Sequence, residues 1–233
     1  MTETSDVQVL PGAIGISMLR VYDTETIDGL YGGSPHMHFV CSEGYVVLGG
    51  SGAVQTLGAR GYEELALEAG MVVWFGPGLI HRLVNHGGLQ ILTLMQNAGL
   101  PEAGDAMFTF PPEVLADPAR YAAAASLRPQ DGEQPIERAY ARRDLAVEGF
   151  LALRESGDLE PFYAAGGALV RDRVPAWREV WERKAKRAAL DTGAQLDAVA
   201  EGRLEHLLAA GLDALPGPRE HGRLGMCGTL DVY

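Results

Sequence analysis

The spacing of hydrophobic positions changes character near residue 110. Before that point, short runs rich in Val, Ile, Leu and aromatic residues are separated by glycine-rich segments. Short apolar runs bounded by turn residues predict β-strands. The strands predicted in this way are Val7–Leu10, Ile14–Tyr22, His36–Cys41, Tyr45–Leu48, Ala53–Leu57, Glu64–Leu67, Met71–Phe75, His81–Asn85 and Leu89–Gln96. Many short strands of this kind favour a sandwich or a closed barrel.

Two glycine-rich segments are predicted as turns between strands. Residues 49–52 read Gly-Gly-Ser-Gly, and residues 85–88, Asn-His-Gly-Gly, have the composition of a tight hairpin. The glycines at 50 and 52 also have the spacing that begins a dinucleotide-binding loop. The third glycine of that loop is replaced by Gln55, and a strand follows where a helix is required. The dinucleotide interpretation is therefore rejected.

After residue 110 the composition shifts to Ala, Leu, Glu and Arg, which predicts helices. The predicted helices are Pro112–Leu127, Pro135–Ser156, Leu159–Val170, Pro175–Leu190 and Thr192–Leu212, several of which begin at or beside a proline. Two apolar stripes at helical spacing are expected to pack against the barrel or against a partner subunit; they are Trp177, Val180 and Trp181, and Leu196, Val199, Ala200, Leu204, Leu207 and Leu208. We therefore predict a β-barrel over residues 1–110 and a helical C-terminal extension over 111–233, with residues 224–233 as a candidate return strand.

Composition and charge narrow the class of protein. The chain has 233 residues, of which 47% are hydrophobic, so it can bury a substantial core. The net charge of −12 argues against nucleic acid as a partner, and no apolar run is long enough to cross a bilayer. The polar, acidic N-terminus does not resemble a secretory signal, and two cysteines, Cys41 and Cys227, suit a reducing compartment. These features predict a cytoplasmic protein.

The candidate chemistry lies in three histidines and one glutamate. His36 and His38 flank Met37, and Glu43 follows after four residues. His81 begins a separate predicted strand. Side chains alternate along a strand, so both imidazoles of His-x-His point to one face. Three imidazoles and a carboxylate form a site suited to Fe, Mn, Ni, Co, Cu or Zn.

Glu43 joins this set only if the chain is irregular before it. It lies five residues beyond His38, and on an unbroken strand it would point to the opposite face. We therefore expect a turn or bulge between Phe39 and Glu43, which the flanking Ser42 and Gly44 make plausible.

The first cluster resembles one motif of the cupin superfamily of small β-barrels. That motif is a glycine, five residues, His-x-His, three or four residues, Glu, six residues and a glycine. The chain matches it from His36 through His38 and Glu43 to Gly50. The leading glycine is replaced by Leu30, a departure that concerns turn geometry and no ligand.

The second cluster resembles the other cupin motif: a glycine, five residues, Pro-x-Gly, two residues, His, three residues and Asn. Gly70, Gly78, His81 and Asn85 match in register, and the proline falls one place late, at Pro77. The two motifs are separated by a short segment, as in compact bacterial cupins. The resemblance covers roughly residues 10–100.

The resemblance implies a cupin, or jelly-roll, barrel with a single divalent transition metal held by His36, His38, Glu43 and His81. This ligand set occurs in dioxygenases, decarboxylases and isomerases. It implies a metal-dependent enzyme for a small polar organic substrate, with oxidoreductase or lyase/isomerase chemistry and Glu43 as a proton shuttle. Relatives commonly form homodimers. The alternative is a non-catalytic sensor for a sugar or organic acid with a structural metal, and the metal and substrate stay open.

Three further residues are weaker candidates for substrate binding. Tyr45 and Val47 share the side-chain direction of Glu43 on a regular strand, which would place them in the pocket. Arg82 follows His81 and should face the opposite way, so a salt bridge at the barrel surface competes with binding of a substrate carboxylate. Cys41 is expected to be a small buried thiol.

Overall fold

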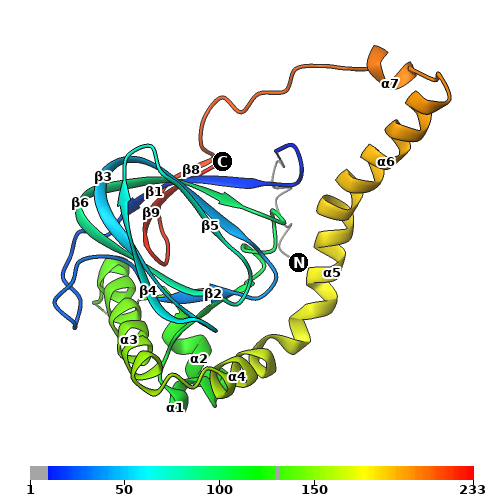
Figure 1. The fold of residues 1–233 in the computed structure, drawn as a ribbon. Helices are drawn as coiled ribbons and strands as arrows, with labels where there is room; N and C mark the ends of the chain where they lie inside the picture. The colour runs from blue at the N-terminus through cyan, green and yellow to red at the C-terminus, as the bar shows by residue number, and fades with distance from the viewer. Residues whose placement is uncertain (1–9, 130–131) are drawn as a thin grey trace.

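The computed structural model describes residues 10–129 and 132–233, and its strands form one rolled antiparallel sheet (Figure 1). The first three residues of the predicted strand Val7–Leu10 lie outside the described residues. The strands are β1 (Gly15–Val21), β2 (His36–His38), β3 (Glu43–Gly58), β4 (Gly61–Glu68), β5 (Val72–Phe75), β6 (Ile80–Met95), β7 (Ala106–Phe108), β8 (Glu220–Leu224) and β9 (Gly228–Val232). Their order is β4-β3-β6-β1-β9-β8, with β5 on β3, β2 on β6 and β7 on β2. The predicted fold class, a β-barrel followed by helices, is confirmed.

The two longest strands, β3 and β6, run through the centre of the sheet. Each was predicted as two strands separated by a turn, and that prediction is wrong, because both strands continue through their glycine-rich segments. The two segments face each other, with Ser51 opposite Gly87, and the register shifts there. Gly50 has φ of +71°, and a Cβ on it would lie 2.2 Å from the carbonyl oxygen of Gly88. Glycine therefore lets the paired strands bend together at close approach without ending them.

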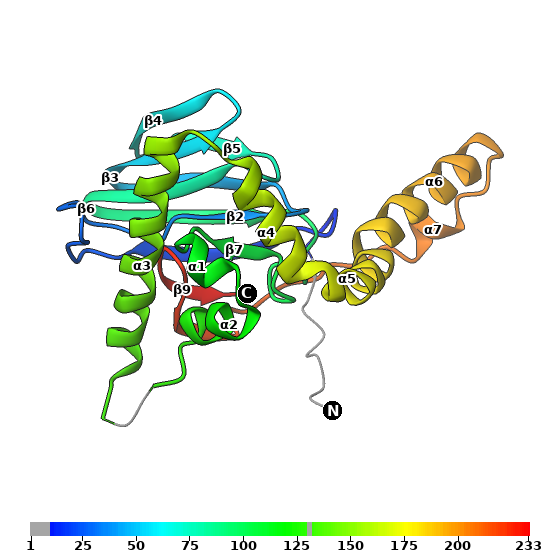
Figure 2. The ribbon, with the colours of Figure 1, turned by 90° about the horizontal axis from the view of Figure 1, so that it is seen from below.

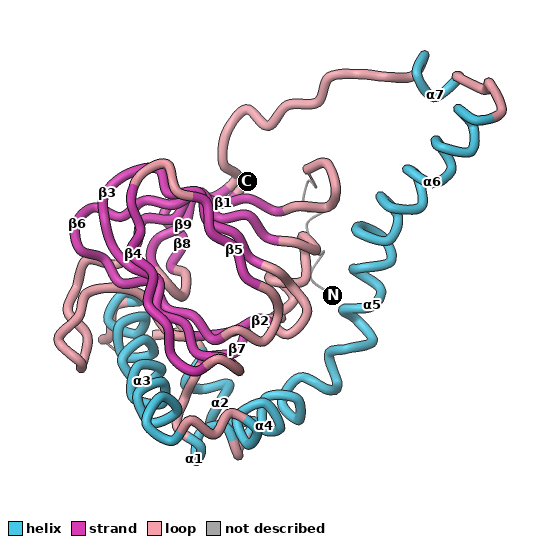
Figure 3. The backbone as a smooth tube through the Cα atoms, in the orientation of Figure 1, coloured by secondary structure: helices cyan, strands magenta, loops and turns pink. Residues whose placement is uncertain are grey.

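The helices fall into two groups. The elements are α1 (Pro112–Leu115), α2 (Pro118–Ala125), α3 (Pro135–Ser156), α4 (Glu160–Val170), a 3-10 turn (Arg171–Arg173), α5 (Val174–Trp181), a π-helical turn (Glu182–Lys186), α6 (Arg187–Ala200) and α7 (Glu205–Leu208). Helices α1 to α4 lie beside the barrel, whereas α5 and α6 run away from it (Figure 2). The tube in Figure 3 shows a long loop returning from α7 to the sheet.

Three predicted helix boundaries are wrong. The helix predicted over 112–127 is two helices, because Asp117 caps the amide nitrogens of Ala119 and Arg120 and starts α2 anew. The break predicted near residue 191 does not occur, since helical backbone runs from Val174 to Ala200. The last predicted helix stops at Ala200, and Gly202 follows with φ of +73°.

The C-terminal tail returns to the barrel, as its sequence pattern indicated. Strand β9 pairs with β1, and β8 pairs with β9. An ion pair joins Arg20 of β1 to Asp231 of β9 at 2.7 Å. The sheet is thus built from both ends of the chain, and the division at residue 110 stays a prediction.

Helix α3 holds the part of the barrel that carries β2 and β7. A Cβ on Gly149 would lie 1.9 Å from the carbonyl oxygen of Thr109, so α3 packs directly on the backbone after β7. Thr109 in turn donates a hydrogen bond to the carbonyl of Ala146 at 2.8 Å. Phe110 and Phe150 are fully buried at this contact. The contact fixes β7, which is the hydrogen-bonded neighbour of β2. None of the described helices has the length and apolarity needed to span a bilayer.

Candidate metal centre

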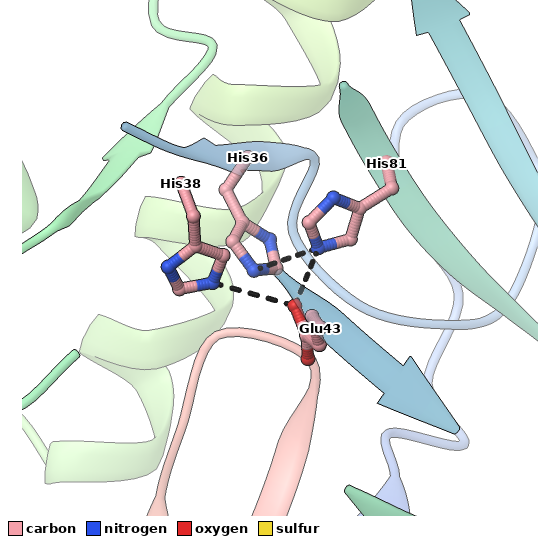
Figure 4. A group of neighbouring side chains, drawn as sticks. All are labelled: His36, His38, Glu43 and His81. Atoms are coloured by element: carbon pink, nitrogen blue, oxygen red, sulfur yellow. Dashed lines mark hydrogen bonds and ion pairs between the residues drawn. The ribbon is translucent and has the colours of Figure 1, made fainter. Parts of the chain in front are cut away.

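Four side chains from three strands converge inside the barrel (Figure 4). His36 and His38 come from β2, Glu43 begins β3, and His81 is the second residue of β6. The Nε2 atoms of His81 and His36 are 3.2 Å apart. Oε2 of Glu43 lies 3.1 Å from Nε2 of His81 and 3.3 Å from Nε2 of His38. One ligand atom from each of the four residues lies within 4.8 Å of the others, and all four residues are buried.

Strand pairing produces this convergence. His36 is the register partner of His81 in the antiparallel pair β2–β6, so the two imidazoles share a face. Strand β2 ends at His38, residues 39–42 leave the strand conformation, and β3 starts at Glu43. The irregularity expected between Phe39 and Glu43 is therefore present. It turns the carboxylate back toward the histidines.

Each imidazole is oriented by an acceptor behind it. Nδ1 of His36 lies 2.9 Å from the carbonyl oxygen of Ser34, and Nδ1 of His81 lies 3.0 Å from that of Leu79. Nδ1 of His38 lies 3.2 Å from a carboxylate oxygen of Asp105. In the neutral form with the proton on Nδ1, which metal binding requires, each Nε2 would present its lone pair to the cluster.

Asp105 is the site residue that sequence reasoning missed. Its side chain is fully buried, and its second oxygen accepts the amide N–H of Phe39 at 3.0 Å and of Val40 at 2.9 Å. The carboxylate thus fixes both the ring of His38 and the turn leading to Glu43. No motif marks it, because it lies more than sixty residues from His38.

The electrostatics of the cluster favour an ionised carboxylate. Burial raises the pKa of Glu43, but contact with His38 and His81 lowers it more, so the pKa lies well below its usual value. Burial and the neighbouring His81 and His38 lower the pKa of His36 far below normal. Burial also lowers the pKa of His38, yet Asp105 and Glu43 outweigh it and raise the value to about 9. A charge-bearing Glu43 among crowded imidazoles is a donor set that a cation would satisfy.

The residues fit a single divalent transition metal. Metal–nitrogen and metal–oxygen bonds of about 2.1 Å place adjacent ligands of an octahedral ion about 3.0 Å apart. The closest contacts between ligand atoms here are 3.1 to 3.3 Å. Oε2 of Glu43 is a buried oxygen without a hydrogen bond of good geometry. A buried carboxylate oxygen is normally satisfied, and a cation at the centre of the four ligands would satisfy this one.

A cavity of about 510 Å³ reaches this cluster. Three of the four candidate ligands, His36, His38 and Glu43, line it. Residues from the second half of the chain also line it, including Arg142 of α3 and Tyr233. Cavities of a few hundred Å³ suit small organic ligands.

The weaker substrate candidates lie away from this cavity. Tyr45 and Val47 are buried in the barrel core, and none of the three candidates is among the residues that line the cavity. The Tyr45 ring packs against Phe75 and His81, and burial together with the charge of Glu43 raises its pKa well above normal. Arg82 forms a salt bridge, but the pair is not at the barrel surface: the guanidinium is buried and donates to Asp28 at 2.6 Å.

Comparisons with known proteins come from solved structures. No protein-family model and no curated protein matches the chain. Pac13 from Streptomyces, described as a nucleoside dehydratase, matches at 15% identity over 43% of this chain and 70% of that chain, with a TM-score of 0.33. A cupin superfamily protein from Desulfitobacterium hafniense matches at 17% over 36% and 66%, with a TM-score of 0.28. The capsular polysaccharide assembling protein CapF of Staphylococcus aureus matches at 17% over 44% and 29%, with a TM-score of 0.33.

Some of these matches belong to the superfamily whose motifs the sequence resembles. Proteins described as cupin or double-stranded β-helix proteins are among them. The chain is similar to cupin proteins in fold, and its described residues bring together the four side chains that the motifs predicted as ligands.

Proposed function

We propose that this chain is a metal-dependent enzyme that acts on a small polar organic substrate by dioxygenase-type or lyase/isomerase-type chemistry. The observation that carries the proposal is the convergence of His36, His38, Glu43 and His81 beside a cavity of about 510 Å³. Four protein ligands leave room for further ligands on an octahedral Fe, Mn, Ni or Zn ion. A site meant only for structure is usually closed.

The protein residues would divide the work between them. When bound, the metal would supply Lewis acidity toward a carbonyl, enolate or carboxylate oxygen. Backbone carbonyls orient the rings of His36 and His81, and the Asp105 carboxylate orients the ring of His38. The candidate ligands are therefore preorganised. Glu43 would receive a proton from the substrate and return it, a role supported by its contacts with the two imidazoles of His38 and His81.

We also propose a homodimer in the cytoplasm. The helices beyond the barrel leave Leu196, Leu207 and Leu208 mostly exposed, at 66%, 58% and 90%. Leu196 lies on α6 and the other two on α7, and exposed leucines of this kind are typical of a surface for association between subunits. The described residues of one chain do not cover it.

The test is turnover by metal-loaded protein. Oxygen uptake and product formation, followed by an oxygen electrode and by NMR, are measured for a panel of small 2-oxo and hydroxy acids. His36→Ala, which removes one ligand, is the control variant. We expect turnover in the wild type and its loss in the variant. Ligand-induced thermal stabilisation without product for every compound would instead establish the sensor alternative and contradict the proposal.

A further inference from the structure

Three arginines are buried in the described part of the chain, and they differ in their partners. Arg82 forms a salt bridge with Asp28 at 2.6 Å, and Arg143 forms one with Asp144 at 2.9 Å. Arg142, which is 7% exposed, pairs with no carboxylate among the described residues. Burying a charge without a counter-ion is costly, so this arrangement calls for an explanation.

The guanidinium of Arg142 is only partly used by the protein. One terminal nitrogen donates to the carbonyl of Gly225 at 2.7 Å and the other to that of Ala125 at 3.3 Å. Nε is buried and has no hydrogen-bond partner among the residues that the structure describes. The group lies over the Phe108 ring at 4.9 Å, and burial lowers its pKa. Arginine has five N–H donors in a planar fork, so capacity for a planar anion is left over.

Arg142 borders the same cavity as the candidate metal ligands. Gly225, which accepts its shortest bond, lies two residues before Cys227, whose Sγ is 3.9 Å from Nδ1 of His36. Phe108, beneath the guanidinium, is the register partner of His36 across β7 and β2. The cavity wall also includes apolar side chains, namely Leu19, Met226 and Leu230. The cavity therefore combines the Arg142 cation, the candidate metal ligands and an apolar wall. Such a pocket suits an organic anion with an apolar body.

We infer that Arg142 binds the carboxylate of a small organic acid, and that the cavity directs the rest of this substrate toward His36, His38 and Glu43. The site of reaction rests on the proposed function, whereas the anion site on Arg142 does not. A carboxylate would satisfy the vacant donors and neutralise the buried charge. Specificity would then come from α3, a helix outside the two motifs.

The experiment measures binding to protein stripped of metal by a chelator, so that no carboxylate can bind through the metal. Hexanoate and its neutral analogue hexanamide are titrated into the wild type by calorimetry or NMR. We expect hexanoate to bind at least about 10-fold more tightly, because a hydrogen bond to a charged group contributes about 1.5–3 kcal/mol. In Arg142→Gln this preference should disappear. Arg142→Lys keeps the charge and loses the fork, and should retain part of the preference.

Controls separate the anion site from folding and from the metal. Arg154→Gln changes an exposed arginine of the same helix that stacks on Tyr62, and it should bind hexanoate like the wild type. Melting temperature and metal content are measured for every variant, since Arg142 also bonds two carbonyls. Equal binding of hexanoate and hexanamide by the wild type, or a preference unchanged in folded Arg142→Gln or Arg142→Lys, would overturn the inference. If the metal-loaded wild type shows no turnover but the metal-free protein still binds hexanoate more tightly than hexanamide, the result counts against the proposed function and not against the anion site.

Discussion

The barrel and the arm formed by α5 to α7 treat charged and apolar residues in opposite ways. In the barrel and the helices packed on it, charged groups such as Arg82, Asp105 and Glu43 are buried in specific contacts. In the arm, no residue between Trp177 and Cys227 is buried, and leucines face the solvent. Burying these polar groups in the barrel costs folding free energy, which their specific contacts offset. The arm instead exposes apolar side chains that no described residue of its own chain covers.

The same kind of substitution should therefore have different consequences in the two regions. Trp177 marks the border, since its indole N–H donates to the carbonyl of Ala103 at 3.0 Å and its ring packs near Phe39. Beyond it, the ion pairs along the helical run from Val174 to Ala200 are exposed and join neighbouring turns of the helix, such as Arg187–Asp191. Exposed pairs contribute little to stability, and buried ones cost a great deal when broken.

The largest effect on stability is expected from Asp28→Asn. It leaves Arg82, whose side chain is fully buried, without its counter-charge. We expect the free energy of unfolding to fall by about 3 kcal/mol. The matched change in the arm, Asp191→Asn, removes an acid that also pairs with an arginine and should cost less than about 0.5 kcal/mol. Urea unfolding measures both, and equal losses would refute the contrast between the regions.

The next effect concerns the metal and not the fold. Asp105→Asn weakens the acceptor that orients His38, so we expect metal affinity to fall by about 10- to 100-fold. Competition with a chromophoric chelator measures the affinity. Asp191→Asn again serves as the control and should leave affinity unchanged. Unchanged affinity in Asp105→Asn would show that the carboxylate has no part in the site.

A pH series sharpens the role of Asp28. Burial raises the pKa of this carboxyl, but bonds from Arg82 and Thr26 lower it more, from 3.8 to about 2. A carboxyl group whose pKa is lowered by folding stabilises the folded protein at every pH above its pKa in the unfolded chain. The contribution is lost as the pH falls from about 4 toward 2. The urea midpoint of the wild type should therefore drop more steeply over this interval than that of Asp28→Asn. Parallel slopes would contradict the assignment.

The smallest effect on the folded monomer is expected in the arm. Leu196→Glu with Leu207→Glu changes two exposed side chains and should alter monomer stability by no more than about 0.5 kcal/mol. If the stripe joins two subunits, the same variant should convert a dimer to a monomer in light scattering. If the wild type itself is a monomer in light scattering, the proposed homodimer is contradicted, whereas the proposal for the site in the barrel is not.

The convergence of the four candidate ligands could be predicted from the sequence, because strand alternation and the two motifs fix their spacing. Asp105 escaped prediction, since a carboxylate that supports a ligand has no fixed distance from it along the chain. The turns predicted at Gly49–Gly52 and at residues 85–88 failed for another reason. Glycine is common both where strands end and where two strands approach closely. Which of these roles applies is seen only once β3 and β6 are paired, because their glycine-rich segments then face each other.

Arg142 shows the same limit in the helical region. Arginines on helices are mostly exposed, and nothing in the spacing distinguishes Arg142 from Arg138 or Arg154. Its burial depends on β8 and β9, which return from the far end of the chain and bring the carbonyl of Gly225 to it. Likewise, the sequence pattern assigns Leu196 and Leu207 to one buried helix face, yet they lie on two helices, α6 and α7, and both are exposed.

The central claim is that His36, His38, Glu43 and His81 hold one metal ion. The most direct measurement is metal analysis by mass spectrometry on full-length protein purified without a nickel column, together with His38→Ala and Asp191→Asn. We expect close to one transition-metal ion per chain in the wild type and in Asp191→Asn, and a large loss in His38→Ala. No metal in the wild type, even after incubation with Fe, Mn, Ni or Zn, would contradict the account, as would full occupancy in His38→Ala.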